Sequence, residues 1–335
     1  MGNVIIRGDG VAACCCAHLL RAAGFRVSLE QTDRRRLPAI LLGDAALALI
    51  RDVFEQKDLF RDLPRIEKRV VAWGPHSTPV TLDHSAVVVS EQLLLESLRP
   101  GLDESDDEPA DAETAWTVFA SRPLPAGLVE HHFGSRHASA APVELKAGEG
   151  PAACCIESLE NGWMFLIPMA SSSGWLLSVG GPPEELLNRS RAIAGRIVNL
   201  LPASGEFPAY PRVASPLGGP GWLACGTAAM AFDPICGDGT AHAIREAILT
   251  TAVIRAAAQG SPTEELFSHY EARLMAGFER HLALCLDFYK SGACGPWWQS
   301  EIESVERGRE WCAGRLRGRT EFRYRLEGFE LRALR

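Results

Sequence analysis

Glycines in a fixed spacing near the N-terminus are the first residues whose types suggest chemistry. The segment Gly8-Asp9-Gly10-Val11-Ala12-Ala13 fits the pattern G-x-G-x-x-G/A. In this pattern the first glycine permits a tight turn, the second lets the backbone approach a pyrophosphate, and the third small residue lets a helix pack on a strand. Glu30 follows Gly10 by 20 residues, where a carboxylate accepts hydrogen bonds from a ribose hydroxyl. These residues therefore predict a site for an adenine dinucleotide without a 2′-phosphate.

A second glycine-rich segment lies far along the chain. It reads Gly226-Thr227-Ala228-Ala229-Met230-Ala231-Phe232-Asp233-Pro234-Ile235-Cys236-Gly237-Asp238-Gly239, and a predicted helix begins at Gly239. Its glycines leave backbone N–H groups free to face a ligand, and the helix N-terminus favours negative charge. A reduced flavin carries such charge near N1 and O2, so this segment indicates a flavin site.

Together the two segments resemble the FAD-dependent monooxygenase superfamily that includes p-hydroxybenzoate hydroxylase, the tryptophan halogenases and the geranylgeranyl reductases. Those proteins carry a G-D-A-A-x-x-x-D-P-x-x-G-x-G-like segment. The resemblance implies that Asp233 holds the ribityl chain of FAD, that Pro234 lies against the isoalloxazine, and that the Gly237–Gly239 helix start meets its pyrimidine edge. The predicted cofactor-binding set also includes Gly226, Thr240 and Arg36. The arginine run at 34–36 either contacts the adenosine phosphates or forms a solvated loop.

The middle and the end of the chain extend this resemblance over most of residues 3 to 300. Asn161-Gly162-Trp163-Met164-Phe165-Leu166-Ile167-Pro168-Met169 resembles the G-W-x-W-x-I-P-L strand of halogenase-like members, with Phe165 in place of the second tryptophan. Residues 270–298, with an aromatic cluster at Phe288, Tyr289, Trp297 and Trp298, resemble their helical tail. The similarity is nearest to the short halogenase-like hydroxylases, which include flavoproteins that oxidise peptidyl tryptophan in quinone-cofactor maturation.

Three departures from the superfamily pattern narrow the expected chemistry. Lys57 and Lys68 stand in charged contexts, and neither matches the lysine that handles hypohalous acid in halogenases, so we do not expect halogenation. Thr227 stands where an aspartate is usual. Glu91 stands in the V-x-R-x-x-L segment where an arginine is usual, so cofactor binding at that point differs or is weak.

Four residues are candidates for a substrate pocket: Trp163, Phe165, Pro168 and His242. Trp163 and Phe165 share one face of a predicted strand because side chains alternate with period 2. That face either lines a pocket or packs on the core, and His242 either faces the ligand or packs its helix. We predict no metal site, because His131, His132 and His137 have no carboxylate at ligand spacing and the cysteines lack a C-x2-C pattern. Consecutive cysteines at 14–16 and 154–155 are expected as small buried residues.

The predicted elements give an order that explains how the two glycine segments could meet. A strand–helix–strand unit spans residues 3–30, helix is expected over 37–60, strands over 70–80 and 81–89, and a helix over 90–98. An acidic loop over 101–113 precedes a strand at 115–120, antiparallel sheet follows to 180, and a helix is expected over 182–201. A short strand at 223–226 and helices over 239–258 and from 262 to about 310 complete the chain.

This order predicts an α/β fold with a discontinuous Rossmann-like FAD-binding domain, an inserted antiparallel-sheet substrate domain and a helical C-terminal tail. The predicted FAD-binding domain comprises residues 1–75, 100–127 and 205–262. The substrate domain comprises residues 76–99 and 128–204, and the helical region comprises residues 263–335.

Composition excludes several other classes of protein. The chain has 335 residues, 47% hydrophobic and 23% charged, with a net charge of −8, and its one arginine cluster is too short for a nucleic-acid footprint. No apolar run reaches the roughly 18 residues of a membrane span, and the first residues lack a signal-peptide layout. We therefore expect a cytoplasmic location and no nucleic-acid partner, and leave the oligomeric state open.

The leading functional hypothesis is an FAD-dependent monooxygenase of an aromatic or indole-like substrate, either a small molecule or a peptidyl tryptophan. Its electrons would come from NAD(P)H or from a partner flavin reductase, and no catalytic side chain is assigned because the cofactor performs the demanding chemistry. The alternatives are a flavin-dependent reductase of the geranylgeranyl reductase kind and a flavin-fold protein that only binds a partner.

Overall fold

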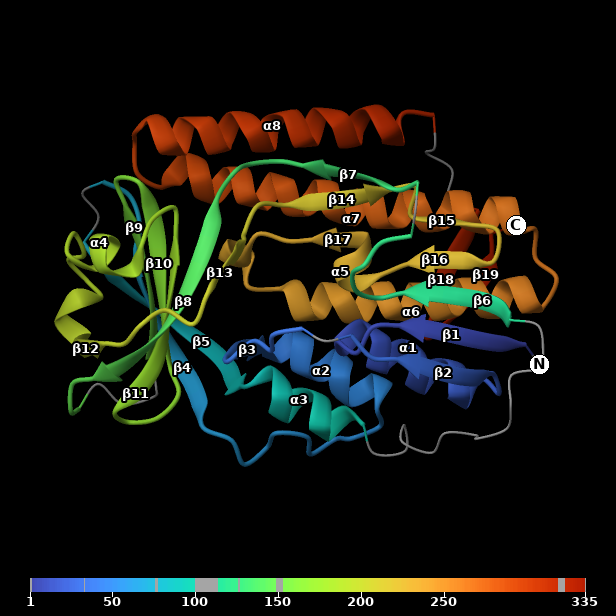
Figure 1. The fold of residues 1–335 in the computed structure, drawn as a ribbon, viewed down its shortest axis with the longest axis horizontal. Coiled ribbons are helices and arrows are strands. Elements are labelled where there is room, and N and C mark those ends of the chain that lie inside the picture. The colour runs from blue at the N-terminus through green and yellow to red at the C-terminus, as the bar shows by residue number, and fades with distance from the viewer. Residues whose placement is uncertain are drawn as a thin grey trace.

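Two separate sheets form the ends of the molecule, and long helices run between them (Figure 1). The structure is a computed structural model that describes residues 2–32, 34–75, 78–99, 114–125, 127–148, 153–318 and 323–334. The predicted acidic loop at 101–113 lies outside these described residues. Among the described helices, none combines the length and apolarity that a membrane crossing needs.

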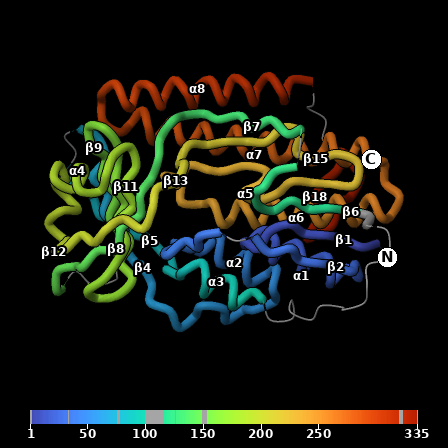
Figure 2. Tube along the Cα trace, in the orientation of Figure 1, coloured from blue at the N-terminus to red at the C-terminus, as the bar shows by residue number. Residues whose placement is uncertain are grey.

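A mostly parallel sheet contains the N-terminus. Its order is β15 (Gly218–Gly219), β16 (Trp222–Ala224), β6 (Thr114–Phe119), β1 (Asn3–Arg7) and β2 (Arg26–Glu30). β1 runs parallel to β2 and β6, and β16 runs parallel to β6. The predicted strand–helix–strand unit is confirmed, with α1 (Val11–Ala22) joining β1 to β2. In Figure 2 the segment that follows β15, late in the chain, returns to the region of β6, where β16 pairs with β6 and β6 pairs with β1.

The consecutive cysteines of α1 let this helix pack closely on α6 (Gly239–Ala258). Cys14, Cys15 and Cys16 are all buried, as predicted. The Cys16 sulfur lies 3.7 Å from the Ala247 carbonyl oxygen of α6. Small side chains at this contact allow the backbones of the two helices to approach closely. Both helices begin on the side of the molecule that faces the larger sheet (Figure 1).

The larger sheet is antiparallel except where β4 pairs parallel with β9. Its strands follow the order β12 (Ile197–Leu200), β8 (His137–Leu145), β11 (Ser173–Val179), β10 (Gly162–Pro168), β9 (Ala153–Leu159), β4 (Arg65–Ala72), β5 (Val80–Val89) and β3 (Ile40–Gly43), with β13 (Glu206–Pro208) beside β8. One face packs on the main core and the other packs on α4 (Pro183–Leu187). The mixed α/β class predicted from the sequence is confirmed.

The remaining elements join these two parts. Antiparallel α7 (Thr263–Ser291) and α8 (Pro296–Leu316) run along both sheets (Figure 1). A third sheet contains β7 (Val129–His132), β14 (Arg212–Ser215) and β17 (Met230–Ala231), and β18 (Tyr324–Glu327) and β19 (Glu330–Ala333) form a hairpin. The short helices are α2 (Asp44–Val53), α3 (Glu91–Leu98), α5 (Gly226–Ala229) and the 3-10 turns η1 (Ala194–Arg196) and η2 (Pro234–Cys236).

The sheets differ in several places from the division predicted from sequence. β3, β4 and β13 pair in the larger sheet, although the prediction assigned them to the nucleotide-binding part. β7, which the prediction placed in the sheet-rich substrate domain, pairs with β14, and the C-terminal region, predicted as helical, ends in a hairpin. Strand pairing over long sequence separations decides these assignments, and local patterns carry little information about it.

The helix predicted over residues 182–201 is wrong beyond Leu187. The buried carboxylate of Glu157 accepts hydrogen bonds from the backbone N–H groups of Arg191, Ala192 and Ile193. These groups would otherwise donate within a helix, so the chain instead turns and forms β12 against β8. The helix predicted over residues 37–60 is likewise limited to α2, because Ile40–Gly43 pairs with β5.

A buried carboxyl on α6 predicts pH-dependent stability. Glu246 accepts the Gly226 N–H at 2.6 Å, and burial raises its pKa from 4.5 to about 8. Between these values the folded state keeps a proton that the unfolded state has released, so stability falls as pH rises, by about 1.4 kcal/mol per pH unit. Urea unfolding across this window should show that Glu246→Gln, which keeps an oxygen acceptor, lacks this loss. Equal pH slopes in the two proteins would contradict the assignment.

Candidate functional site

The first glycine segment forms a tight loop at the end of β1. Gly8 has a φ of +136°, and a Cβ there would lie 3.0 Å from the Ser121 backbone nitrogen beside β6. A Cβ on Gly10 would meet the Arg34 Nη2 at 3.2 Å. Val11, Ala12 and Ala13 are buried at the start of α1. The loop therefore needs its glycines for backbone conformation and for the close approach of an arginine.

Two arginines from the 34–36 run pair with buried acids around this loop. The carboxylate of Asp9, 3% exposed, forms ion pairs with Arg34 and Arg36 and accepts from Thr32. Burial opposes ionisation of Asp9, but these partners outweigh it and hold its pKa below the usual value. Arg34 and Arg36 therefore lie against the glycine loop. Glu30, the predicted ribose contact, is exposed and pairs with Arg7.

Glu91, found where the superfamily has an arginine, binds Arg34. Its buried carboxylate accepts from Arg34 Nη1 at 3.0 Å, forms a second contact with Nη2, and accepts the Leu37 N–H at 2.8 Å. Burial opposes the charge of Arg34, but Glu91 and Asp9 outweigh it and raise its pKa. A guanidinium therefore reaches Gly10 from the segment after β2, while α3 supplies the acid that holds it.

Several observations test whether these residues fit an FAD. Both α1 and α6 begin without a side-chain cap, so their first N–H groups are directed at whatever lies beyond the helix ends. A Cβ added at Gly237 or Gly239 would meet no atom within 4 Å. Arg36 Nη1 is buried without a hydrogen-bond partner. An anionic dinucleotide would meet two positive helix ends and an unsatisfied guanidinium N–H, so the residues fit the group.

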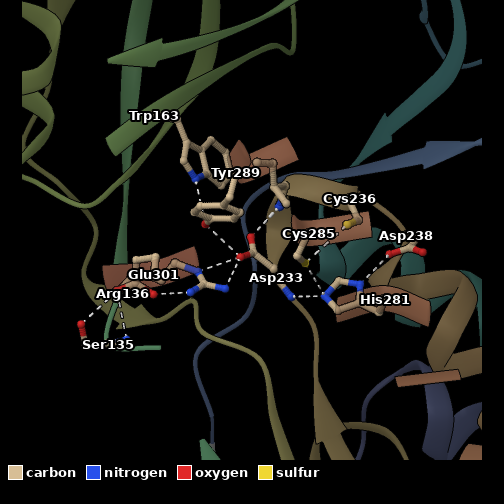
Figure 3. Close-up of polar contacts among 11 residues, drawn as sticks. Ser135, Arg136, Trp163, Asp233, Cys236, Asp238, His281, Cys285, Tyr289 and Glu301 are labelled. Atoms are coloured by element: carbon tan, nitrogen blue, oxygen red, sulfur yellow. Dashed lines mark hydrogen bonds and ion pairs between the residues drawn. The ribbon is translucent and has the colours of Figure 1, made fainter. Parts of the chain in front are cut away.

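Asp233, the predicted ribityl contact, lies in a fully buried network (Figure 3). Arg136 Nε donates to its Oδ2 at 2.7 Å, the Tyr289 hydroxyl donates at 3.0 Å, and Asp233 Oδ1 caps η2 through the Ile235 N–H. Arg136 also pairs with Glu301 of α8. Burial opposes the charge of Arg136, but its acidic neighbours raise its pKa above the usual value. Asp233 has no exposed side-chain surface, so in this conformation it anchors the loop before α6.

The pocket candidates separate into two groups. Trp163 is buried and donates from Nε1 to the Tyr289 oxygen at 3.4 Å, which links it to Asp233. His242 pairs with Asp238 at 2.9 Å and stacks on Phe232. Phe165, although on the same face of β10 as Trp163, lies beneath the Arg69 guanidinium, and Pro168 is buried at the strand end. The structure connects Trp163 and His242 to the 233–239 loop, which also contains Pro234, and leaves the other two apart.

The remaining predicted contacts lie around this loop. Gly226, with φ +54°, packs so closely that a Cβ would lie 2.8 Å from the Ala12 Cβ. Thr227 hydrogen-bonds the Ala120 carbonyl oxygen at 3.4 Å, and Thr240 lies half-buried in the first turn of α6. Gly226 therefore holds the second segment against the first.

Sequence reasoning missed the residues that support this loop: Arg136, Glu301, His281 and Cys285. His281 and Cys285 are one turn apart on α7, a spacing that could have drawn attention to them. His281 Nε2 accepts the Asp233 N–H at 2.8 Å. Arg136 gave no comparable signal, because its acidic partners lie 97 and 165 residues away.

Comparison with known proteins shows the fold. No family model matches the sequence, and no curated protein matches it. The peptidyl tryptophan dihydroxylase QhpG, described as essential for tryptophylquinone cofactor biogenesis, matches with a TM-score of 0.70 and 20% identity over 89% of this chain and 78% of its own. The flavin-dependent halogenase CmlS matches with a TM-score of 0.74 and 16% identity, over 95% and 72% of the two chains.

A variant of HpxO from Klebsiella pneumoniae, solved with FAD, matches with a TM-score of 0.66 and 15% identity over 94% of this chain and 97% of its own. At these sequence identities, the similarity to the solved structures supports a shared fold and nothing beyond it. The chain has the fold of FAD-dependent monooxygenases and halogenases, which confirms at that level the resemblance seen in the sequence.

Proposed function

We propose that the chain is an FAD-dependent monooxygenase that hydroxylates an aromatic or indole-like substrate. The observation that carries the proposal is the pair of uncapped helices, α1 and α6, that begin at the predicted glycines and start on the same side of the molecule. Bound and reduced, FAD would supply the electrons with which O2 inserts one oxygen atom into a ring and releases the other as water.

The chain's own residues would then bind and orient. Arg34, Arg36 and the first N–H groups of α1 would hold the pyrophosphate, and the turn from Gly237 to Thr240, at the positive end of α6, would bind the flavin ring. The buried Asp233–Arg136–Glu301 network keeps that turn in place. His242, half-buried in the first turn of α6, would border the substrate side, and the buried Trp163 would support it through Tyr289.

A peptidyl tryptophan is the substrate we favour within this class. The support is the structural likeness to QhpG, which is described as a peptidyl tryptophan dihydroxylase, together with the sequence resemblance to that group. The electron donor, NAD(P)H or a partner flavin reductase, stays a prediction.

Single-turnover labelling tests the proposal. The purified protein is loaded with FAD, photoreduced without oxygen, and mixed with ¹⁸O2 and either free indole compounds or tryptophan-containing peptides. We expect ¹⁸O in one of these products by mass spectrometry, and none when free FAD replaces the protein. Substrate reduction without oxygen would instead favour the reductase alternative, and failure to bind FAD would favour a binding protein.

A further inference from the structure

Two cysteines beside the 233–239 loop lie close enough to react with each other. The sulfurs of Cys236, at the end of η2, and Cys285, on α7, are 3.8 Å apart (Figure 3). A disulfide requires about 2.05 Å between sulfurs, so the two atoms must close by less than 2 Å. Cys236 belongs to a short turn, which can move by that amount more easily than a buried helix.

A second pair of cysteines lies at a similar distance but differs in its surroundings. The sulfurs of Cys16 and Cys225 lie 4.0 Å apart. Both residues are fully buried between α1 and the end of β16, and the hydrogen bond with Cys16, followed by burial, raises the pKa of Cys225. That pair lacks access to solvent, and Cys225 lacks a lowered thiol pKa, so the pair serves as an internal control.

The surroundings of Cys236 differ in both respects. Cys236 is only partly buried, and the hydrogen bond from Cys285, together with the nearby His281, lowers its pKa to about 7. The Cys285 sulfur lies 3.3 Å from His281 Nε2. Charged or titratable groups around the pair also include Asp233, Asp238 and His242, and His281 Nδ1 faces Asp238 Oδ1 at 4.0 Å. A thiolate at Cys236 is thus available beside the Cys285 thiol.

A metal ion is the competing use of this cluster. Cys236, His281 and Cys285 offer three ligand atoms within 4.8 Å of one another. However, His281 Nε2 already accepts the Asp233 N–H at 2.8 Å, and that lone pair is the one a metal would need. The geometry favours thiol chemistry.

We propose that Cys236 and Cys285 form a dithiol site that hydrogen peroxide oxidises to a reversible disulfide. The Cys236 thiolate attacks one peroxide oxygen, so that an S–O bond forms, the O–O bond breaks and hydroxide leaves to become water. The Cys285 sulfur then attacks the Cys236 sulfur, and the Cys285 proton goes to the departing hydroxide. The S–S bond forms, the S–O bond breaks, and a second water leaves.

The net reaction consumes one peroxide and two thiols and yields one disulfide and two waters. The new bond would tie η2 covalently to α7. This inference goes beyond the proposed function and does not depend on it, since peroxide can be added to the flavin-free protein.

The experiment uses the full chain with Cys294→Ser, because Cys294 is exposed and could form intermolecular disulfides. Flavin-free protein is treated with hydrogen peroxide, alkylated under denaturing conditions with and without prior reduction, and mapped by peptide mass spectrometry. We expect a reducible link between the Cys236 and Cys285 peptides, while Cys16 and Cys225 stay alkylated as free thiols. Cys285→Ala should instead accumulate sulfenic and sulfinic acid at Cys236.

The rate of Cys236 alkylation against pH provides a second readout. We expect a midpoint near 7 in the parent and a higher midpoint in Cys285→Ala. Irreversible oxidation of Cys236 in the parent with Cys285 still free would overturn the proposal. So would equal linkage of the Cys16–Cys225 pair, or bound zinc that protects both thiols.

Discussion

Replacing Arg136 with methionine is expected to lower the free energy of unfolding by about 3–5 kcal/mol, the range measured when one partner of a buried ion pair is removed. The substitution would leave Asp233 and Glu301 as buried carboxylates without their cation. These acids lie before η2 and on α8, so the loss would loosen the contact between the 233–239 loop and the C-terminal helices. The local packing has no room to compensate, since a side chain at Gly134 would collide with both Arg136 and Glu301.

Urea unfolding with linear extrapolation measures this effect. Arg7→Met is the matched control, because its pair with Glu30 is about half exposed, and exposed pairs contribute about 1 kcal/mol or less. Neutralising the acids in Arg136→Met/Asp233→Asn/Glu301→Gln should recover part of the loss, since no charge is then buried unpaired. An Arg136→Met protein as stable as Arg7→Met would refute the role of this network.

Replacing Arg34 with methionine is expected to weaken FAD binding about 10- to 100-fold, the equivalent of one or two charge-assisted hydrogen bonds. Arg34 reaches the Gly10 loop while Glu91 holds its guanidinium. Glu91→Gln should weaken FAD binding less. The variant loses the acid that positions Arg34 but keeps the Arg34 guanidinium itself.

Flavin fluorescence titration measures these dissociation constants, and unfolding midpoints check that the variants are folded. Arg35→Met is the control, since Arg35 lies next in sequence but is directed at Gly205 instead of the Asp9 and Glu91 carboxylates. Equal losses of affinity in the Arg34 and Arg35 variants would indicate general charge attraction and would exclude a specific contact.

The parts of the fold that the sequence predicted well depend on local patterns. The Gly8–Ala13 turn, the short apolar strand before it and the small residues of α1 all act within about 30 residues, so their structure follows from the nearby chain. The long helix starting at Gly239 was predicted for the same reason, because its apolar residues and its glycine start are adjacent in sequence.

Long-range polar contacts explain what the sequence did not predict. Glu157 accepts hydrogen bonds from backbone N–H groups more than 30 residues away. These bonds end a helix that the local sequence after Pro182 favours. Glu91 looked like the loss of a cofactor contact, whereas the structure pairs it with Arg34 from another segment. Asp233 matched a motif, but its burial depends on Arg136 and Tyr289, which no spacing rule connects to it.

Binding of FAD by the flavin-free protein tests the central claim most directly. Titration of FAD into the purified chain, followed by the flavin absorbance near 450 nm and by fluorescence, should saturate at one FAD per chain. Gly10→Val, which places a branched side chain where the backbone is expected to approach the pyrophosphate, should abolish saturation while the protein stays folded. A folded parent protein that leaves the FAD signal unchanged throughout the titration would contradict the assignment of these two glycine segments to a flavin site.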